Sequence, residues 1–172
     1  IPSRNGLMRP KKVRGEGTKM INMGELFAHD RIGDMPMDRV PLSKEEAIKF
    51  LVEPLDLLFA RASLTLAGAG RCVLVTESVD ERTFESHIIR VRLNKRIAHP
   101  PFYYYFFRSP VGRDVMSTII EQVSAAGIRA SDLPSLPVPH PQVSEQVKVA
   151  EVLGSLDDKI EQNRRTGRKL EE

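Results

Sequence analysis

Basic residues are concentrated in the first twenty positions of the 172-residue chain, where Glu16 is the one acidic residue. The basic residues there are Arg4, Arg9, Lys11, Lys12, Arg14 and Lys19. Glycines interrupt this segment, as in loops that bind phosphate groups, where lysine and arginine release the counterions condensed on a nucleic-acid backbone. The segment therefore indicates nucleic-acid binding, although charged runs are also common on solvated surfaces.

Two short motifs resemble sequence motifs of methyltransferases but lack the surrounding residues that such a site requires. His99-Pro100-Pro101-Phe102 has the form of the Asn/Asp-Pro-Pro-aromatic motif of amino-methyltransferases. Histidine replaces poorly a side chain that must accept hydrogen bonds from the target amine. The segment Gly68-Ala69-Gly70 lacks a following helix pattern, which would bring a cofactor phosphate to a helix N-terminus. We expect no catalytic site and no cofactor.

Metal-dependent chemistry is equally weakly indicated. Asp157-Asp158-Lys159 has the carboxylates and lysine of a nuclease site, but a solvated helix face explains it more simply. The histidines are scattered without the spacing of metal ligands, at positions 29, 87, 99 and 140. We expect no metal site.

A folded domain must position any binding residues, because the chain is 41% hydrophobic and 28% charged, a balance that can bury a core. Its length suits one compact domain plus an appendage. The single cysteine, Cys72, excludes an intramolecular disulfide, and no apolar run approaches the about 20 residues of a membrane span. We expect a soluble cytoplasmic protein.

Short apolar runs predict a strand-rich domain, with strands at 19–23, 55–60, 72–75 and 87–93. A capping box of Ser43 and Glu46 predicts a helix that ends by Pro54. A second helix is predicted from Pro110 to Gly127. The six aromatics at 102–107 are expected in the core, with one or two tyrosine hydroxyls left for phosphate.

Alternate prolines at 133–141 exclude a helix there and mark a boundary. From Ser144 to Glu172 an uninterrupted helix of about 43 Å is predicted. Residues along it are spaced alternately four and three apart: Val149, Leu153, Leu156, Ile160, Asn163, Gly167 and Leu170. Such a heptad seam needs a partner helix, and its polar asparagine would select the register or partner. The alternative is an amphipathic helix folded onto its own domain.

These C-terminal segments resemble one half of the specificity subunit of type I restriction-modification systems. The resemblance covers the proline-rich run 136–139, the pair Glu145-Gln146 and the run 149–163, which ends in Ile-Glu-Gln-Asn. Upstream, 56–61 is similar to the strand that leads into the family's variable loop, and 101–103 with Ser109 is similar to its next helical segment. Residues 21–23 fit the strand after the first basic loop.

The resemblance implies an α+β protein: a mixed, strand-rich target-recognition domain at 1–139, followed by a long coiled-coil-forming helix at 140–172. It implies a non-catalytic subunit that directs restriction and adenine methylation to a split DNA site. The implied partners are double-stranded DNA, the modification subunits and, through them, the restriction subunit. A homodimer through the C-terminal helix would use Val149, Leu153, Leu156, Ile160, Asn163 and Leu170.

Within this framework we assign phosphate contacts and base contacts to different residues. The phosphate contacts are assigned to Lys11, Lys12, Arg14 and Lys19. The side chains assigned to base edges in the major groove are Asn22, Arg61, Arg71, Arg92, Asn94 and Lys95.

Two departures from the family pattern affect the loop after Arg61. Leu55 and Ser63 stand where the family usually has glycine. Full-length members also carry two recognition domains, so the chain is expected to be a fragment or a half-sized subunit. Two alternatives stay open: the recognition region of a fused restriction-methyltransferase, and a helical scaffold whose basic loop binds an acidic partner other than DNA.

Overall fold

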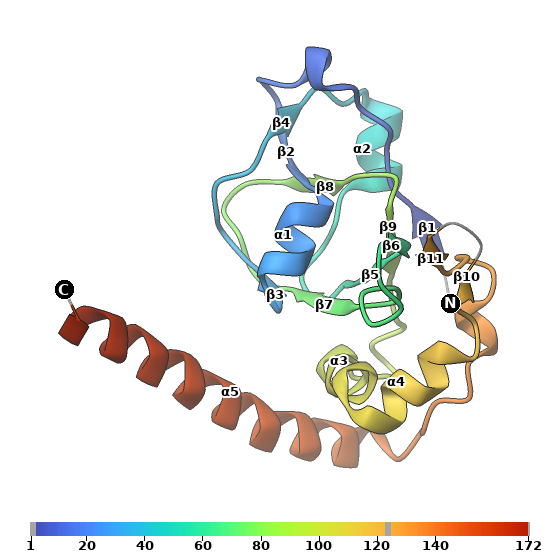
Figure 1. Ribbon diagram of the computed structural model, residues 1–172, viewed down its shortest axis with the longest axis vertical. Helices are drawn as coiled ribbons and strands as arrows, with labels where there is room; N and C mark the ends of the chain where they lie inside the picture. Colours follow the sequence, from blue (N-terminus) through green and yellow to red (C-terminus); the bar gives the residue numbers. More distant parts are fainter. Residues whose placement is uncertain (1–2, 123–124, 172) are drawn as a thin grey trace.

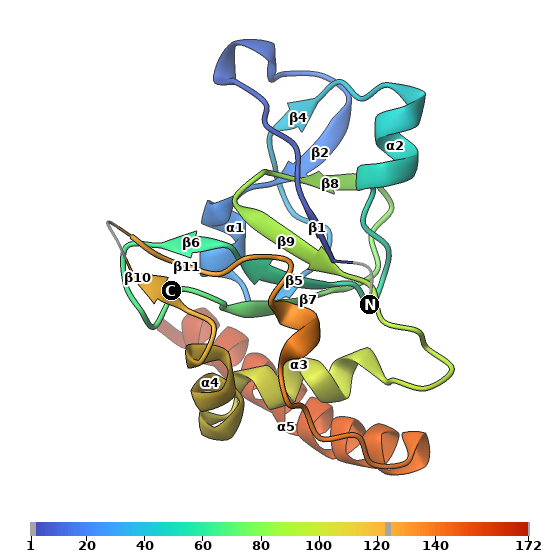
Figure 2. The same ribbon diagram turned by 90° about the vertical axis from the view of Figure 1, so that its right-hand side faces the viewer.

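A five-stranded sheet forms the centre of the computed structural model, which describes residues 3–122 and 125–171. Side chains at 165 and 168–171 are not described. Across the sheet the strands are β1 (Ser3–Asn5), β9 (Ile88–Val91), β5 (Leu57–Ala60), β7 (Cys72–Val75) and β3 (Arg31–Ile32). Neighbours are antiparallel except β3, which runs parallel to β7 (Figures 1 and 2). The strands predicted at 55–60, 72–75 and 87–93 are confirmed.

The central strands β5, β7 and β9 are buried on both faces, and side chains alternate between the two faces along each strand. Phe59 and its cross-strand partner Cys72 belong to one hydrophobic core. Leu58 and its partner Val73, one position along, belong to the other. This double burial explains why β5 and β7 are continuous apolar runs rather than alternating ones.

The aromatic run forms helix α3 (Pro100–Arg108), which covers the first core together with α4 (Pro110–Ser117). Tyr103, Tyr104 and Phe107 are buried, so the predicted core position is confirmed. The expectation of free tyrosine hydroxyls is wrong. The Tyr103 hydroxyl lies 2.8 Å from Nδ1 of His140, that of Tyr104 is buried, and that of Tyr105 bonds to other side chains of the protein.

A second, three-stranded sheet lies at the end of the body away from α5 (Figure 1). Its strands are β4 (Arg39–Val40), β2 (Thr18–Ile21) and β8 (Arg82–Phe84). A 3-10 turn, η1 (Lys11–Val13), and α2 (Lys44–Phe50) accompany it (Figure 1). The predicted capping box is confirmed, because the Glu46 N–H donates to Ser43 Oγ and the Ser43 N–H to Glu46 Oε2.

The predicted strand at 19–23 is wrong at its end. β2 stops at Ile21, and Asn22 begins helix α1 (Met23–Ala28). The Glu25 carboxylate accepts the Asn22 N–H at 2.8 Å, which satisfies a donor that a helix start leaves unpaired.

The helix predicted from Pro110 to Gly127 is also wrong, because α4 stops at Ser117. The chain then forms β10 (Glu121–Gln122) and β11 (Ala126–Gly127), and β11 pairs with β6 (Ala62–Ser63). Ile119 and Ile120 fit helical spacing, but their branched Cβ atoms disfavour a helix. Positions 123–124 of the predicted helix lie outside the described residues.

The proline-rich segment is extended apart from a 3-10 turn, η2 (Leu133–Ser135), so the prediction of no helix at 133–141 is wrong for these three residues. Helix α5 (Val143–Glu171) follows, so the long C-terminal helix and the mixed α+β class are confirmed. Its first half packs on α3, and its second half extends beyond the body (Figure 1). Among the described residues, no helix combines the length and the apolar character needed to cross a bilayer.

Candidate nucleic-acid interface

The exposed η1 turn carries Lys11 and Lys12. It lies at the end of the body farthest from α5 (Figure 1). Within the described part of the chain, neither ammonium group has a hydrogen bond or ion pair. Both are therefore available to an external phosphate.

Arg14 and Asn22 lie in contact, but their polar groups bind each other and other groups of the protein. The Arg14 guanidinium donates to Asn22 Oδ1 at 2.9 Å and to Asp38 at 2.7 Å. Asn22 also donates to the Met20 carbonyl. These contacts fix the chain after η1 against the start of α1.

Lys19 is held between two carboxylates. Its Nζ lies 2.6 Å from Asp34 and 2.9 Å from Asp80. The hydrogen bonds with Asp34 and then Asp80 raise the pKa of Lys19. Its charge is already balanced inside the protein.

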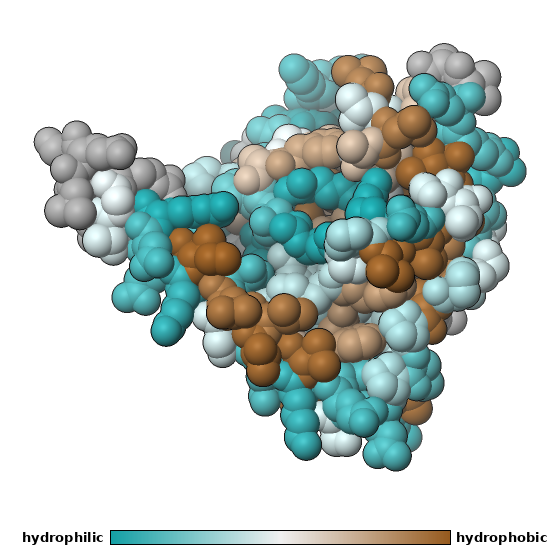
Figure 3. Space-filling view, turned by 60° about the horizontal axis from the view of Figure 1, so that its bottom comes forward, coloured by the Kyte–Doolittle hydropathy of each residue, from teal (hydrophilic) through white to brown (hydrophobic). Residues whose placement is uncertain are grey.

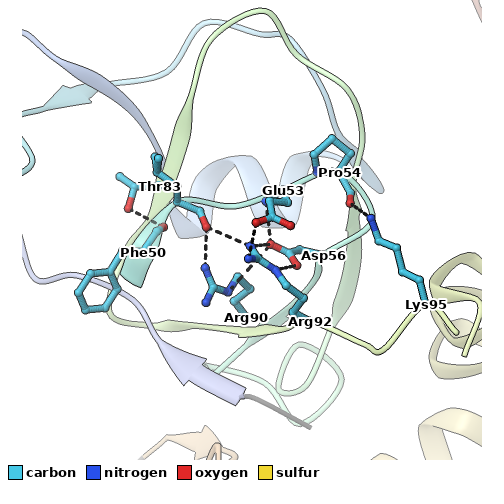
Figure 4. Close-up of polar contacts among 9 residues, drawn as sticks. Phe50, Glu53, Pro54, Asp56, Thr83, Arg90, Arg92 and Lys95 are labelled. Atoms are coloured by element: carbon cyan, nitrogen blue, oxygen red, sulfur yellow. Dashed lines mark hydrogen bonds and ion pairs between the residues drawn. The ribbon is translucent and has the colours of Figure 1, made fainter. Parts of the chain in front are cut away.

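Arg92 pairs with a buried carboxylate, as Figure 4 shows. Its Nε and Nη2 donate to the two oxygens of Asp56 at 2.8 and 2.7 Å, and Nη1 donates to Glu53 at 2.6 Å. Asp56 is 1% exposed, so this two-pronged contact supplies the charge that its burial requires. Neighbouring Arg90 donates to the carbonyl of Leu51 at 2.6 Å.

Asn94 and Lys95 are exposed in the turn after β9. The Asn94 side chain accepts the Arg96 N–H at 3.1 Å. The Lys95 ammonium donates to the Pro54 carbonyl at 3.4 Å (Figure 4). The last contact is long, so the Lys95 ammonium is only loosely held.

Arg61 and Arg71 stand at the two ends of the loop 61–71 between β5 and β7. Arg61 donates to the Ser86 carbonyl at 3.0 Å, and Arg71 donates to Asp30 at 2.8 Å. The candidates thus occupy three places: the η1 and β2 region, the end of β9, and this loop.

Sequence reasoning missed two arginines beside this loop. Arg108, from the last turn of α3, donates to the same Asp30 oxygen as Arg71 at 2.7 Å. Arg113, from α4, donates through Nη2 to the carbonyls of Ala67 and Ala69 at 3.0 and 2.9 Å. We call Arg71, Arg108 and Arg113 the arginine cluster. No signal in the sequence brings them together, because they come from three elements.

Two arginines of the cluster lower the pKa of the Asp30 carboxyl. Burial by itself raises the pKa of this carboxyl, but the hydrogen bond and charge of Arg108, with the charges of Arg71 and Arg164, hold it below its ordinary value. Asp30 is therefore a carboxylate at neutral pH.

One face of α5 is fixed to the body. Gln146 is fully buried: its Oε1 accepts the His99 N–H at 2.7 Å, and its Nε2 donates to the Pro141 carbonyl at 2.8 Å. One turn later Ala150 is buried, and at Gly154 an added Cβ would lie 3.7 Å from the Tyr105 hydroxyl. Small residues thus let α5 approach α3 closely.

The same face ends in an ion-pair network. Tyr105 donates to Asp157 at 3.0 Å, and Arg31 of β3 donates to Asp158 at 2.7 Å and to the Tyr105 hydroxyl at 2.8 Å. Asp157 and Asp158 keep 40% and 72% of their side chains exposed, as expected of a solvated helix face, and they also bind groups of the body. Together with Gln146, these contacts form what we call the α5 clamp.

The heptad seam lies on a different face of α5 and is largely exposed. Val149, Leu156 and Ile160 are 44%, 54% and 48% exposed, Leu153 is partly buried, and Asn163 is exposed. The Leu170 side chain lies outside the described residues. Figure 3 shows an apolar stripe along the helix. The helix thus packs on its own domain through one face and keeps an apolar face uncovered.

Comparison with known proteins agrees with this architecture. Residues 13–172 match the family model for the type I restriction modification DNA specificity domain. The EcoKI specificity subunit of Escherichia coli (strain K12) is 28% identical over 148 residues, which cover 85% of this chain and 32% of that subunit.

Solved structures show the same fold. The HsdS subunit of Thermoanaerobacter tengcongensis superposes with a TM-score of 0.64 at 12% identity, covering 96% of this chain and 37% of that one. A chain from a study of complex assembly and conformational transition of the type I R-M system gives a TM-score of 0.68 at 13% identity, covering 95% and 37%.

The chain thus spans about a third of the length of these relatives. The family model nevertheless covers nearly all of it, including the loop 61–71, the arginine cluster and both faces of α5. The chain therefore belongs to the family of type I restriction-modification DNA specificity domains.

Proposed function

We propose that this chain reads one half of a split DNA target for a type I restriction-modification system. Residues 1–139 would form the reading domain, and residues 140–172, which contain α5, would form the spacer between it and a second one. The observation that carries this proposal is the division of α5 into a clamped polar face and an uncovered apolar face. A helix that only completed its own domain would have no reason to keep Val149, Leu156 and Ile160 exposed.

The proposed partners follow from the same division. Double-stranded DNA would meet the cationic loops of the reading domain, while the apolar face of α5 would bind the α5 helix of a second copy. The helices would also receive the modification subunits, and through them the restriction subunit. The chain itself would supply recognition, and its partners the chemistry.

Selection from a random duplex library tests this function. The purified chain, alone and with its modification subunits, is incubated with the library, and bound duplexes are sequenced. We expect one recurring half-site from the chain alone and a split site from the complex. Equal retention of all duplexes in both experiments would contradict sequence reading and leave only a scaffold that binds acidic surfaces.

A further inference from the structure

The arginine cluster lines a hollow beside the loop 61–71. The hollow measures about 190 Å³, and Ala67, Cys72 and Phe107 complete its lining. This is far more than the about 10–15 Å³ that admits one water molecule. The middle of this loop carries exposed apolar side chains, with Leu64 97% exposed and Leu66 52% exposed.

The charges around this hollow are unbalanced in favour of the cations. Three guanidinium groups line it, and Asp30 pairs with two of them, Arg71 and Arg108, while Arg113 contacts only backbone carbonyls. Several other ion-paired groups are balanced or acidic. Lys19 and Arg39 lie with Asp34 and Asp80, Arg90 and Arg92 with Glu53 and Asp56, and Arg31 with Asp157 and Asp158.

Arg113 is the least satisfied member of the cluster. Its Nη1 is buried and makes no hydrogen bond, although Nη2 donates to the loop carbonyls. Burial, with the nearby charge of Arg71, lowers the pKa of Arg113. A buried guanidinium nitrogen without an acceptor is costly, and the charge of Arg113 has no carboxylate partner beside the hollow, so an anion there would balance it.

We infer that the hollow binds a phosphate group, held by Arg71, Arg108 and Arg113, and that its source is the DNA backbone. Guanidinium groups suit this ligand because their planar donors match the paired oxygens of a phosphate. A backbone phosphate held there would bring Leu64 and Leu66 against the duplex, where the thymine methyl offers an apolar contact. The DNA part of this inference rests on the proposed function.

Titration with inorganic phosphate tests the hollow without DNA. Chloride at equal ionic strength is the reference, and the side-chain nitrogen resonances of the arginines are followed by NMR. We expect saturable shifts at the three guanidiniums and none at Arg129, whose guanidinium pairs with Glu121. Shifts that never saturate, or that appear equally at Arg129, would overturn the site.

The salt dependence of binding to a random-sequence duplex tests the source of the phosphate. Between about 50 and 200 mM salt, each neutralised phosphate contributes about 0.9 to the slope of log K against log salt. Arg113→Gln should lower that slope by about one unit, whereas Arg113→Lys keeps the charge and the slope. Lys49→Gln, on exposed α2 at the far end of the body, controls for the loss of one positive charge.

The outcomes separate this inference from the proposed function. An unchanged slope for folded Arg113→Gln overturns the DNA source while the function stands. If Arg113→Gln does not fold, the comparison moves to Arg108→Lys and Arg108→Gln, where only the second removes the charge. A wild-type chain that binds no duplex but shows saturable phosphate shifts overturns the function and leaves the site.

Discussion

Cationic side chains in this protein fall into two groups, which differ in the carboxylates that lie near them. Lys19 and Arg92 are bound to acidic partners and stabilise the fold. Lys11 and Lys12 have no such partners within the described residues, and the arginine cluster has one carboxylate for three charges. Cations of the second group carry positive charge in excess of the carboxylates beside them, which the phosphates of DNA could neutralise.

The η1 lysines give the first prediction at this scale. Lys11→Ala with Lys12→Ala should weaken binding to all duplex sequences and reduce the salt slope by up to about two units. Fluorescence anisotropy at several salt concentrations measures it. The matched control is Lys44→Ala with Lys49→Ala on exposed α2. A double variant with the wild-type slope would remove η1 from the interface.

Asp30 should make stability depend on pH in the acidic range. Its pKa in the folded protein is held below the ordinary 3.8, with Arg108 and Arg71 outweighing burial. Its stabilisation is therefore complete above about pH 4 and is lost as the pH falls through the folded value. Urea midpoints of wild type and Asp30→Asn should converge from about pH 6 to about pH 3. Asp114→Asn, at an exposed position, is the control, and a constant gap for Asp30→Asn would contradict the argument.

At the scale of elements, those determined by local sequence could be predicted, whereas those determined by contacts between distant residues could not. β5 and β7 could be predicted because burial on both faces makes them continuous apolar runs. Helix α4 could not be bounded, because the pairing of β11 with β6 joins residues more than sixty positions apart. Helix α1 was missed although Asn22 and Glu25 form a readable capping box, so that signal was present and unused.

The residues of the candidate site also divide into those readable from local sequence and those brought together by packing. The exposure of Lys11 and Lys12 could be predicted from local composition alone. The arginine cluster could not be predicted, because its members come together only when α3 and α4 pack beside β7. The seam of α5 was visible in its spacing, but its separate clamped face depends on Gln146 meeting His99 across 47 positions.

The clamp predicts a loss of stability confined to buried contacts. Gln146→Ala leaves the His99 N–H and the Pro141 carbonyl without their partner and should lower the free energy of unfolding by about 1–3 kcal/mol. Gln162→Ala, at an exposed position of the same helix, should stay within about 0.5 kcal/mol of wild type. Urea denaturation measures both. Equal losses would mean that the clamp contributes nothing beyond helix propensity.

The uncovered face of α5 predicts dimerisation. Leu156→Lys should weaken a homodimer at least about a hundredfold, because a symmetric interface loses two buried leucines of about 1.5–3 kcal/mol each. Gln162→Lys adds the same charge at an exposed polar position and should not change association. Sedimentation equilibrium distinguishes them. A wild-type monomer at high micromolar concentration, unaffected by Leu156→Lys, would count against the proposed interface.

At the scale of the whole molecule, the proposed spacing of two readers depends on how firmly α5 is held against residues 1–139. The 29 residues of α5 span about 43 Å, longer than the about 34–36 Å of one DNA turn between half-sites. Contacts at Gln146 and Asp157 hold the helix at two points three turns apart. A spacer can set the separation of two readers only if its angle to each reader is fixed.

This rigidity predicts how affinity divides between the two halves of a target. A dimer should bind the selected split site about 10²–10⁴ times more tightly than a duplex with one half scrambled, because the second contact is intramolecular. Gln146→Ala with Asp157→Ala should leave binding to the scrambled duplex unchanged and reduce the ratio about tenfold, since a loose helix spreads the second reader over more positions. Gln162→Ala should keep the wild-type ratio. If the double variant also keeps it while remaining dimeric, the dimer seam alone positions the readers and the clamp only stabilises the domain.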